Sequence, residues 1–236
     1  GIRGAKKIPL LMQCAARPAS DGSAHVIITL PNGQEVSSQD ANVHDVLSTT
    51  FERPVLLQSL PAESAPGHFE PGVPDSSDMM TEIRQILGRE ESDPLPDFSA
   101  FPSNITEFST PPGTHYDCWP LLVMSSSALE AMKKAVPDSV VDILRFRPSV
   151  VVNTPNETGH PEFLWEGRKA QLGSAVVEFL KPCPRCVMIT RRVTQDIPED
   201  RAIIRHVIHE LNQAVGIYAS IVTPGKVSVG DTLTFL

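Results

Sequence analysis

The sequence has few cysteines, few basic residues and no long apolar run. Four cysteines in 236 residues are too few for a disulfide scaffold of this length, which favours a reducing, cytoplasmic setting. A net charge of −8, with a pI near 5.3, argues against a nucleic-acid-binding protein, because neutralising phosphates needs a surplus of lysine and arginine. No apolar run approaches the ~20 residues that span a bilayer, and no signal peptide opens the chain, so we expect no membrane insertion.

The sequence also lacks an internal repeat and the common catalytic and nucleotide-binding motifs. It contains no GxGxxG, Walker, GxSxG or HExxH pattern. It therefore gives no sign of a dinucleotide site, a P-loop, a serine-hydrolase elbow or a zincin centre. With 41% hydrophobic residues, the chain can bury one large core or two modest ones.

The first sixty residues are typical of a β-rich region. Residues 25–30 predict a strand, the Pro-Asn-Gly at 31–33 predicts a turn, and residues 34–36 resume an extended pattern. The spacing of apolar residues predicts a helix over 42–51, and a further strand is expected over 55–58.

Residues 61–112 differ, because they are rich in proline and acidic residues and poor in β-branched ones. They predict a long surface loop that is interrupted by one short helix over 81–87. A loop of this length is uncommon unless it covers a functional site or is mobile.

Two helices are expected beyond this loop. The run 120–124 predicts a buried strand, and the serine cluster at 125–127 predicts an N-capped helix. The cluster could also hold an anion, although plain capping is the simpler interpretation. The second helix is predicted over 198–211, where His206 and His209 stand three residues apart and either share a ligand or are solvated.

The most informative segment is KPCPRCVMIT at residues 181–190, which holds two of the four cysteines. Arg185 stands between Cys183 and Cys186. A neighbouring cation favours the thiolate, which is the form of cysteine that binds metals and attacks electrophiles. The β-branched residues that follow predict that this loop leads into a strand over 187–194.

Four interpretations of the cysteine pair are open. A thioredoxin-like redox motif needs its first cysteine at a helix N-terminus, which the predicted strand does not provide. A structural zinc site needs four ligands, and Cys14 and Cys118 each stand alone. The other two interpretations are a single thiolate that binds a soft transition metal and a pair of buried structural thiols.

Five segments, taken in order, resemble the MOSC domain, the module named after the C-terminal part of molybdenum-cofactor sulfurase. They are RFRPSVVV at 145–152, EFLWEG and a Leu-Gly pair over 162–173, the cysteine segment at 181–190, NQAVGIYA at 212–219, and PGKV, VGD and a leucine over 224–233. The resemblance extends from about residue 116 to residue 236.

The resemblance implies a mostly β fold with some helix, of the α+β class. We expect a curved antiparallel β-barrel over 113–236, with a few helices outside it, and a β-rich N-terminal lobe over 1–112. The chain is most similar to the amidoxime-reducing members, whose N-terminal domain opens with strands of the Tyr-Pro-Val-Lys-Ser and Gly-Asp-Arg types. Neither strand occurs here, so residues 1–7 are expected to correspond to the middle of that domain.

The resemblance also implies a site for a molybdenum cofactor of the molybdopterin type. Cys186 corresponds to the cysteine that coordinates molybdenum, and Cys183 to a position that varies in the family. The other matching positions are expected to contact the pterin or its phosphate: Lys6, Ser125, Ser126, Arg147, Ser149 and Arg185. Ser149 stands where the family usually has asparagine, so it keeps a polar group but loses the amide donor.

The function that the resemblance implies is an oxidoreductase. It would reduce N-hydroxylated compounds or related small molecules with N–O or S–O bonds, with Cys186 as metal ligand and catalytic centre. A separate redox protein would supply electrons, because the sequence has no flavin or iron–sulfur motif. The alternative is a non-enzymatic carrier of sulfur or cofactor, with a persulfide on Cys186. The oxidoreductase is favoured because the arginine and serine matches belong to a complete cofactor pocket, which a sulfur carrier would not need.

Pyridoxal phosphate is associated with the family chiefly through members that are fused to a pyridoxal-phosphate-dependent sulfurase. No lysine in this sequence stands out as a Schiff-base residue. We therefore do not expect pyridoxal phosphate in this protein.

Overall fold

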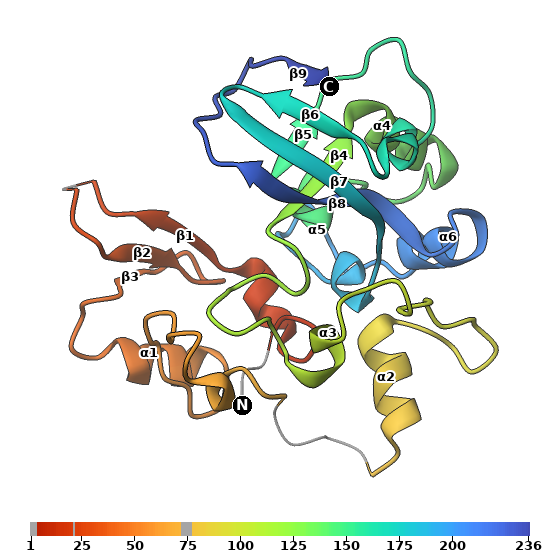
Figure 1. Ribbon diagram of the computed structural model, residues 1–236. Helices are drawn as coiled ribbons and strands as arrows, with labels where there is room; N and C mark the ends of the chain where they lie inside the picture. The colour runs from red at the N-terminus through yellow and green to blue at the C-terminus, as the bar shows by residue number, and fades with distance from the viewer. Residues whose placement is uncertain (1–3, 21, 72–76) are drawn as a thin grey trace.

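The computed structural model describes residues 4–20, 22–71 and 77–236, so the first three residues of the N-terminal segment lie outside it. Within these residues the strands form two sheets (Figure 1). The smaller sheet is antiparallel, with the order β1-β2-β3. Its strands are β1 (Ala15–Pro18), β2 (Val26–Thr29) and β3 (Glu35–Ser37).

The larger sheet has six strands in the order β5-β4-β8-β7-β6-β9 and curls into a half-barrel (Figure 1). Every neighbouring pair is antiparallel except β4 and β5, which are parallel. The prediction of an α+β fold with a curved, mostly antiparallel sheet is therefore confirmed. The strands are β4 (Leu121–Ser125), β5 (Val150–Val152), β6 (Lys169–Leu172), β7 (Ala175–Pro184), β8 (Ala214–Thr223) and β9 (Leu233–Phe235).

The helices are short. Among the residues that the structure describes, no helix is long and apolar enough to cross a membrane. The α-helices are α1 (Val43–Thr50), α2 (Met79–Leu87), α3 (Asn104–Glu107), α4 (Ser126–Ala135), α5 (Ile143–Phe146) and α6 (Ala202–Glu210). The 3-10 helices are η1 (Pro9–Gln13), η2 (Pro66–His68), η3 (Pro161–Trp165) and η4 (Val187–Thr190).

The half-barrel is packed on both faces. One hydrophobic cluster, built around Trp165, Phe179 and Ile217, includes partly buried residues of both edge strands, so it fills the concave side. A second cluster joins the opposite face of the sheet to α4, α6 and η4. At Gly216 β8 approaches β4 so closely that an added Cβ would lie 2.9 Å from the Met124 side chain, and its φ of +76° also favours glycine.

In the N-terminal region the predicted strands are confirmed as β2 and β3, and the predicted helix as α1. The strand expected over 55–58 is wrong. The small core of the N-terminal sheet packs β2 and β3 against α1. The segment at 55–58 runs beside α1 instead of joining a ladder. The backbone N–H of Val55 donates to Ser48 Oγ at 3.0 Å, and that of Leu57 donates to His44 Nδ1 at 3.1 Å. Side chains of the helix therefore satisfy the groups that a partner strand would otherwise have paired.

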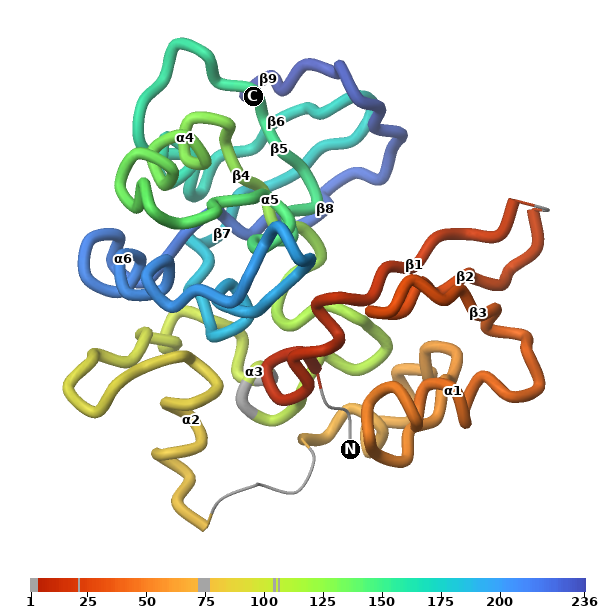
Figure 2. The backbone as a smooth tube through the Cα atoms, turned by 180° about the vertical axis from the view of Figure 1, so that it is seen from behind, coloured from red at the N-terminus to blue at the C-terminus, as the bar shows by residue number. Residues whose placement is uncertain are grey.

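The proline-rich stretch 61–112 is more deeply integrated than a surface loop. The helix predicted over 81–87 is confirmed as α2, which Asp78 caps and Gly88 ends in the left-handed conformation. Among the described side chains of the stretch, Phe69, Arg89 and Asp93 are buried. Figures 1 and 2 both place α2 on the side of α6, away from the three-stranded sheet.

The strand predicted after the cysteines is wrong. The cysteine loop follows a strand, β7, and leads into the 3-10 helix η4. The β-branched residues of η4 are buried, with Ile189 at 0% exposure in the cluster that includes α6. Their apolar surface is thus buried without a strand, since tertiary packing overrides β-propensity.

Candidate functional site at the cysteine loop

The cysteine loop begins where β7 leaves β8. The last pairing of these strands joins Pro184 to Ala214, and the backbone N–H of Arg185 then donates to the Gln213 carbonyl at 2.8 Å. Register shifts surround Pro182 and Pro184, which cannot donate to the ladder. Two prolines therefore end the pairing and turn the chain out of the sheet just before Cys186.

Arg145 holds the other end of the loop. Its side chain is completely buried, and its guanidinium donates to four backbone carbonyls and, among the described residues, to no carboxylate. These carbonyls belong to Val140, Ile189, Arg191 and Pro198. Burial lowers the pKa of Arg145, while Asp200 and Asp142 oppose that effect. One side chain thus fixes η4 and the segment that leads to α6.

Cys183 and Cys118 behave as buried structural thiols. They pack together with Tyr218, and all four cysteines are free. Burial raises the pKa of Cys183 although Arg185 opposes it. Burial, with the charges of Asp117 and Cys183, raises the pKa of Cys118 to about 12. Neither thiol is therefore prepared to ionise at neutral pH.

Cys186 is different, because its thiol is only half-buried and has charged neighbours. Lys6 Nζ lies 4.0 Å from Asp117 Oδ2, and the Tyr218 hydroxyl donates to Asp117 Oδ1 at 3.3 Å. Burial alone would lower the pKa of Lys6, but the negative charges of Cys186 and Asp117 outweigh it, and the pKa is raised. The structure thus brings Lys6 to the same site as Cys186.

Arg185 points inward from the loop. Its Nη1 donates to Cys183 Sγ at 3.3 Å and its Nη2 to the Phe146 carbonyl at 2.9 Å. Its Nε is buried and has no hydrogen-bond partner among the described residues. Desolvation would lower the pKa of Arg185, but Cys183 and Cys186 raise it overall. The cation is therefore retained, with one donor still unsatisfied.

Arg147 and Ser149 follow directly after Phe146, whose carbonyl holds Arg185. Arg147 ends α5 with a φ of +54°, and its side chain is exposed. Across the described residues its guanidinium has no hydrogen-bond or ion-pair partner. Ser149 contacts β4 instead, because its hydroxyl accepts from the Leu122 N–H at 3.3 Å and its own N–H donates to the Leu122 carbonyl.

Ser125 and Ser126 lie at the far end of β4, where the capping interpretation is correct. Ser125 is completely buried; its hydroxyl donates to Glu162 Oε2 and accepts from the Ala128 N–H of α4. Ser126 contacts Asn153 and Thr154 beyond β5. The contacts of both serines lead toward η3 and β5 and not toward the cysteine loop, and their role in binding a cofactor stays a prediction.

The two histidines of α6 also lie apart from the loop. His209 Nε2 is 2.6 Å from Arg205 Nη2, on the side that faces Asp93. Burial lowers the pKa of His206, with smaller effects of Glu210 and His160. Within residues 4–20, 22–71 and 77–236, no three His, Cys, Asp or Glu side chains converge as a metal site.

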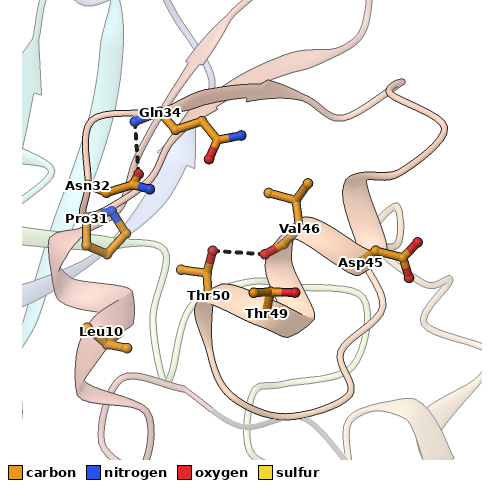
Figure 3. A pocket seen from close by; sticks show the side chains of 8 residues that line it. All are labelled: Leu10, Pro31, Asn32, Gln34, Asp45, Val46, Thr49 and Thr50. Carbon is orange, nitrogen blue, oxygen red and sulfur yellow. Dashed lines mark hydrogen bonds between the residues drawn. The ribbon is translucent and has the colours of Figure 1, made fainter.

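A cavity of about 510 Å³ lies in the N-terminal region between η1, the β2–β3 turn and α1 (Figure 3). Asp45 is its one charged lining residue. The Asn32 side chain accepts from the Gln34 N–H, and the Thr50 hydroxyl donates to the Val46 carbonyl, so two of its polar groups already have partners. The thiol and the cluster of cations are elsewhere, at the cysteine loop.

Sequence reasoning missed four residues of this loop's surroundings: Arg89, Asp117, Gln213 and Tyr218. Gln213 and Tyr218 lie inside the segment at 212–219, which carries the resemblance, so their position was a usable signal. Asp117 lies three residues before the strand predicted over 120–124, so its closeness to that strand was a usable signal. Arg89 gave no signal at all.

Comparisons with known proteins identify one family and include a distant solved structure. The family model of the MOSC domain matches residues 111–234, which is more than half of the chain. A solved structure described as the crystal structure of a hypothetical protein is 16% identical, with a TM-score of 0.36. That alignment covers 49% of this chain and 50% of the other, so it spans about half the length of the solved chain. The search of curated proteins found no match.

Proposed function

Because the chain belongs to the MOSC domain family, which is associated with molybdenum-cofactor binding, we propose that the cysteine loop binds a molybdenum cofactor with Cys186 as the metal ligand. The observation that carries this proposal is a single half-buried thiol among cations. Thiolate is a ligand that soft transition metals prefer. Cys118 and Cys183 are buried against each other, which leaves Cys186 as the accessible thiol of the loop.

The charged groups around the thiol fit the anionic part of a molybdopterin. Lys6 is partly exposed and Arg147 is exposed, so each can reach a phosphate or a pterin oxygen. Arg185 carries a buried Nε donor with no partner, which a ligand oxygen would satisfy. We assign Lys6, Arg147 and Arg185 to the cofactor, and Ser149 to the wall beside it. Ser125 and Ser126 would need to exchange their present partners to join this set.

We propose further that the protein is an oxidoreductase of the amidoxime-reducing kind, acting on N-hydroxylated compounds or related N–O or S–O substrates. When bound, the metal would supply the two-electron chemistry of this reduction, with electrons from a separate redox protein. Reducing an N-hydroxyl group to an amine and water also consumes two protons. Lys6 Nζ and Asp117, both partly open to solvent, are placed to carry protons to the site.

The test is metal analysis and a reductase assay of protein from a host that makes molybdopterin. Hydroxylamine-type substrates and a chemical electron donor would be used. Cys186→Ala should abolish both the bound molybdenum and the turnover without unfolding the protein. Cys14→Ala is the matched control, because that thiol is also half-buried but lies in the core of the N-terminal sheet. Unchanged molybdenum content in Cys186→Ala would refute the proposal.

The second candidate is a carrier that holds a persulfide on Cys186. The same accessible thiol favours this function. The contacts of Ser125 and Ser126 lead away from the loop, and a sulfur carrier would not need them there. A metal-free protein that accumulates cyanide-labile sulfur on Cys186, and none in Cys186→Ala, would support the carrier over the oxidoreductase.

A further inference from the structure

Arg89 belongs to the proline-rich stretch, yet its side chain ends at the cysteine loop. It is 5% exposed and follows Gly88, the left-handed residue that ends α2. Gly88 packs against the backbone of Val187 in η4: an added Cβ would lie 3.3 Å from the Val187 Cα. This close contact brings the first turn after α2 against the residue that follows Cys186.

The Arg89 guanidinium closes a ring of hydrogen bonds around the peptide that precedes Cys186. Its Nη2 donates to the Arg185 carbonyl at 3.1 Å and its Nε to Gln213 Oε1 at 3.0 Å. The backbone carbonyl of Gln213 accepts in turn from the Arg185 N–H. The Arg185 carbonyl and the Cys186 N–H belong to one planar peptide unit, so fixing the carbonyl also fixes where the backbone enters Cys186.

The Arg89 guanidinium has no hydrogen bond to a carboxylate in the part of the chain that the structure describes. Its three acceptors are neutral: the Arg185 carbonyl, the Gln213 side-chain oxygen and the Leu87 carbonyl, to which Nη1 donates. Asp93, whose charge acts on Arg89, accepts hydrogen bonds from Arg205 at both of its oxygens. Burial lowers the pKa of Arg89, while Asp93 and Cys186 act in the opposite direction. A buried, weakly compensated cation therefore lies beside the thiol.

We propose that Arg89 is a positioning residue of the cysteine site: it orients the Arg185–Cys186 peptide and makes the surroundings of the Cys186 thiol selective for anionic reactants. The inference rests on the proposed function only in taking Cys186 as the reactive group. It applies equally to a cofactor phosphate and to an anionic substrate, since both present the same negative charge.

The charge part can be tested on the cofactor-free full chain by alkylating Cys186. Anionic iodoacetate and neutral iodoacetamide both react with the thiolate and release iodide, so the ratio of their rates does not depend on how much thiolate is present. The ratio would be measured by mass spectrometry of the peptide that contains Cys186. In Arg89→Met we expect the iodoacetate-to-iodoacetamide ratio to fall about three- to tenfold, as loss of one nearby charge predicts at an intermediate dielectric constant. Arg89→Lys, which keeps the charge, should stay within about twofold of the wild type.

Arg84→Met is the matched control. Arg84 lies on α2 and also donates to two backbone carbonyls, those of Glu90 and Asp93, but none of its bonds reaches the cysteine loop. Its ratio should be unchanged. An unchanged ratio in Arg89→Met, or an equal fall in Arg84→Met, would overturn the charge role.

The positioning part has its own readout in hydrogen exchange. Lysine cannot donate to three separate acceptors at these positions, so Arg89→Lys should exchange faster over residues 185–191 while its alkylation ratio is kept. Wild-type exchange in Arg89→Lys would overturn the positioning role, and this arm remains decisive if Arg89→Met does not fold. Neither measurement involves molybdenum. A protein that fails to bind the metal would therefore refute the proposed function, whereas the role of Arg89 is decided by alkylation and hydrogen exchange alone.

Discussion

Replacing Asp93 by asparagine should break the main electrostatic link between the proline-rich stretch and α6. Asp93 is 4% exposed, and Arg205 donates to both of its carboxylate oxygens, at 2.5 Å and 3.0 Å. The Glu90 N–H donates to the same carboxylate. Bidentate pairs of this kind are among the stronger hydrogen bonds in proteins. The link matters for the site because Arg89, which donates to the cysteine loop, stands in the sequence between the end of α2 and Asp93.

We expect Asp93→Asn to lower the free energy of unfolding by about 2–3 kcal/mol at pH 7. The shape of the side chain is kept, but the amide removes the charge and turns a donor toward the guanidinium. The cost lies below that of a fully buried ion pair because the Arg205 side chain is 26% exposed and water can solvate it. Against a typical total stability of about 5–15 kcal/mol, the loss is readily measured by urea unfolding.

The effect should depend on pH with a defined sign. The hydrogen bonds from Arg205, despite desolvation, hold the pKa of Asp93 below its ordinary value of 3.8. The unfolded chain therefore binds this proton more tightly than the folded protein does. The stabilisation is present above the unfolded pKa and is lost as the pH falls through the folded one. The difference between wild type and Asp93→Asn should shrink from about pH 5 to about pH 3. A difference that stays constant over this range would refute the reasoning.

Two further predictions concern buried groups near the cysteine loop. Arg145→Met should lower the free energy of unfolding by about 3–5 kcal/mol, because four buried carbonyls lose their donor. The matched control is Arg147→Met, which replaces an exposed side chain and should lower it by less than about 0.5 kcal/mol. Equal losses in urea unfolding would contradict this prediction. The raised pKa of Cys118, about 12 against 9.0, stabilises the fold below pH 9, and this contribution is lost as the pH rises toward 12. Wild type should therefore lose more stability than Cys118→Ala between pH 8 and pH 10.5 in urea midpoints, and parallel losses would argue against burial as the cause.

Local patterns predicted the elements whose partners are close in sequence or whose faces are amphipathic. The helix beginning after Ser125 was identified from its cap, and the serine hydroxyl indeed accepts from the Ala128 N–H. The apolar spacing over 198–211 gave α6, although the helix begins at Ala202 and not at Pro198. In both cases the deciding interactions lie within a few residues.

The cysteine loop could not be predicted in this way. Val187 and Ile189 have high β-propensity, and the strand reading followed from that property alone. In the folded protein a register shift beside Pro184 marks the end of the ladder, and Arg145 donates to the Ile189 carbonyl from 44 residues away. The conformation of η4 is thus set by long-range bonds, which single-sequence patterns do not contain.

Arg89 shows the same limit for the site. It stands in a stretch that has the composition of a loop, and its partner Gln213 is 124 residues away. Composition indicated a loop with one short helix, and the described residues of 61–112 contain no strand of either sheet. It could not indicate that one turn of this stretch is buried, because burial depends on where α2 packs and not on what the stretch contains.

The charge of the whole chain and the charge of the site have opposite signs, and this difference is itself informative. The chain carries −8 overall, yet Lys6 and Arg185 lie near one accessible thiol, and Arg89 adds a buried charge. A positive site on an acidic protein concentrates small anions locally while the surrounding surface repels large polyanions. Net charge bears on the expected classes of macromolecular partner and does not describe the ligand of the loop. The anionic ligand that we propose for the loop would depend on this local charge, which only the folded chain creates.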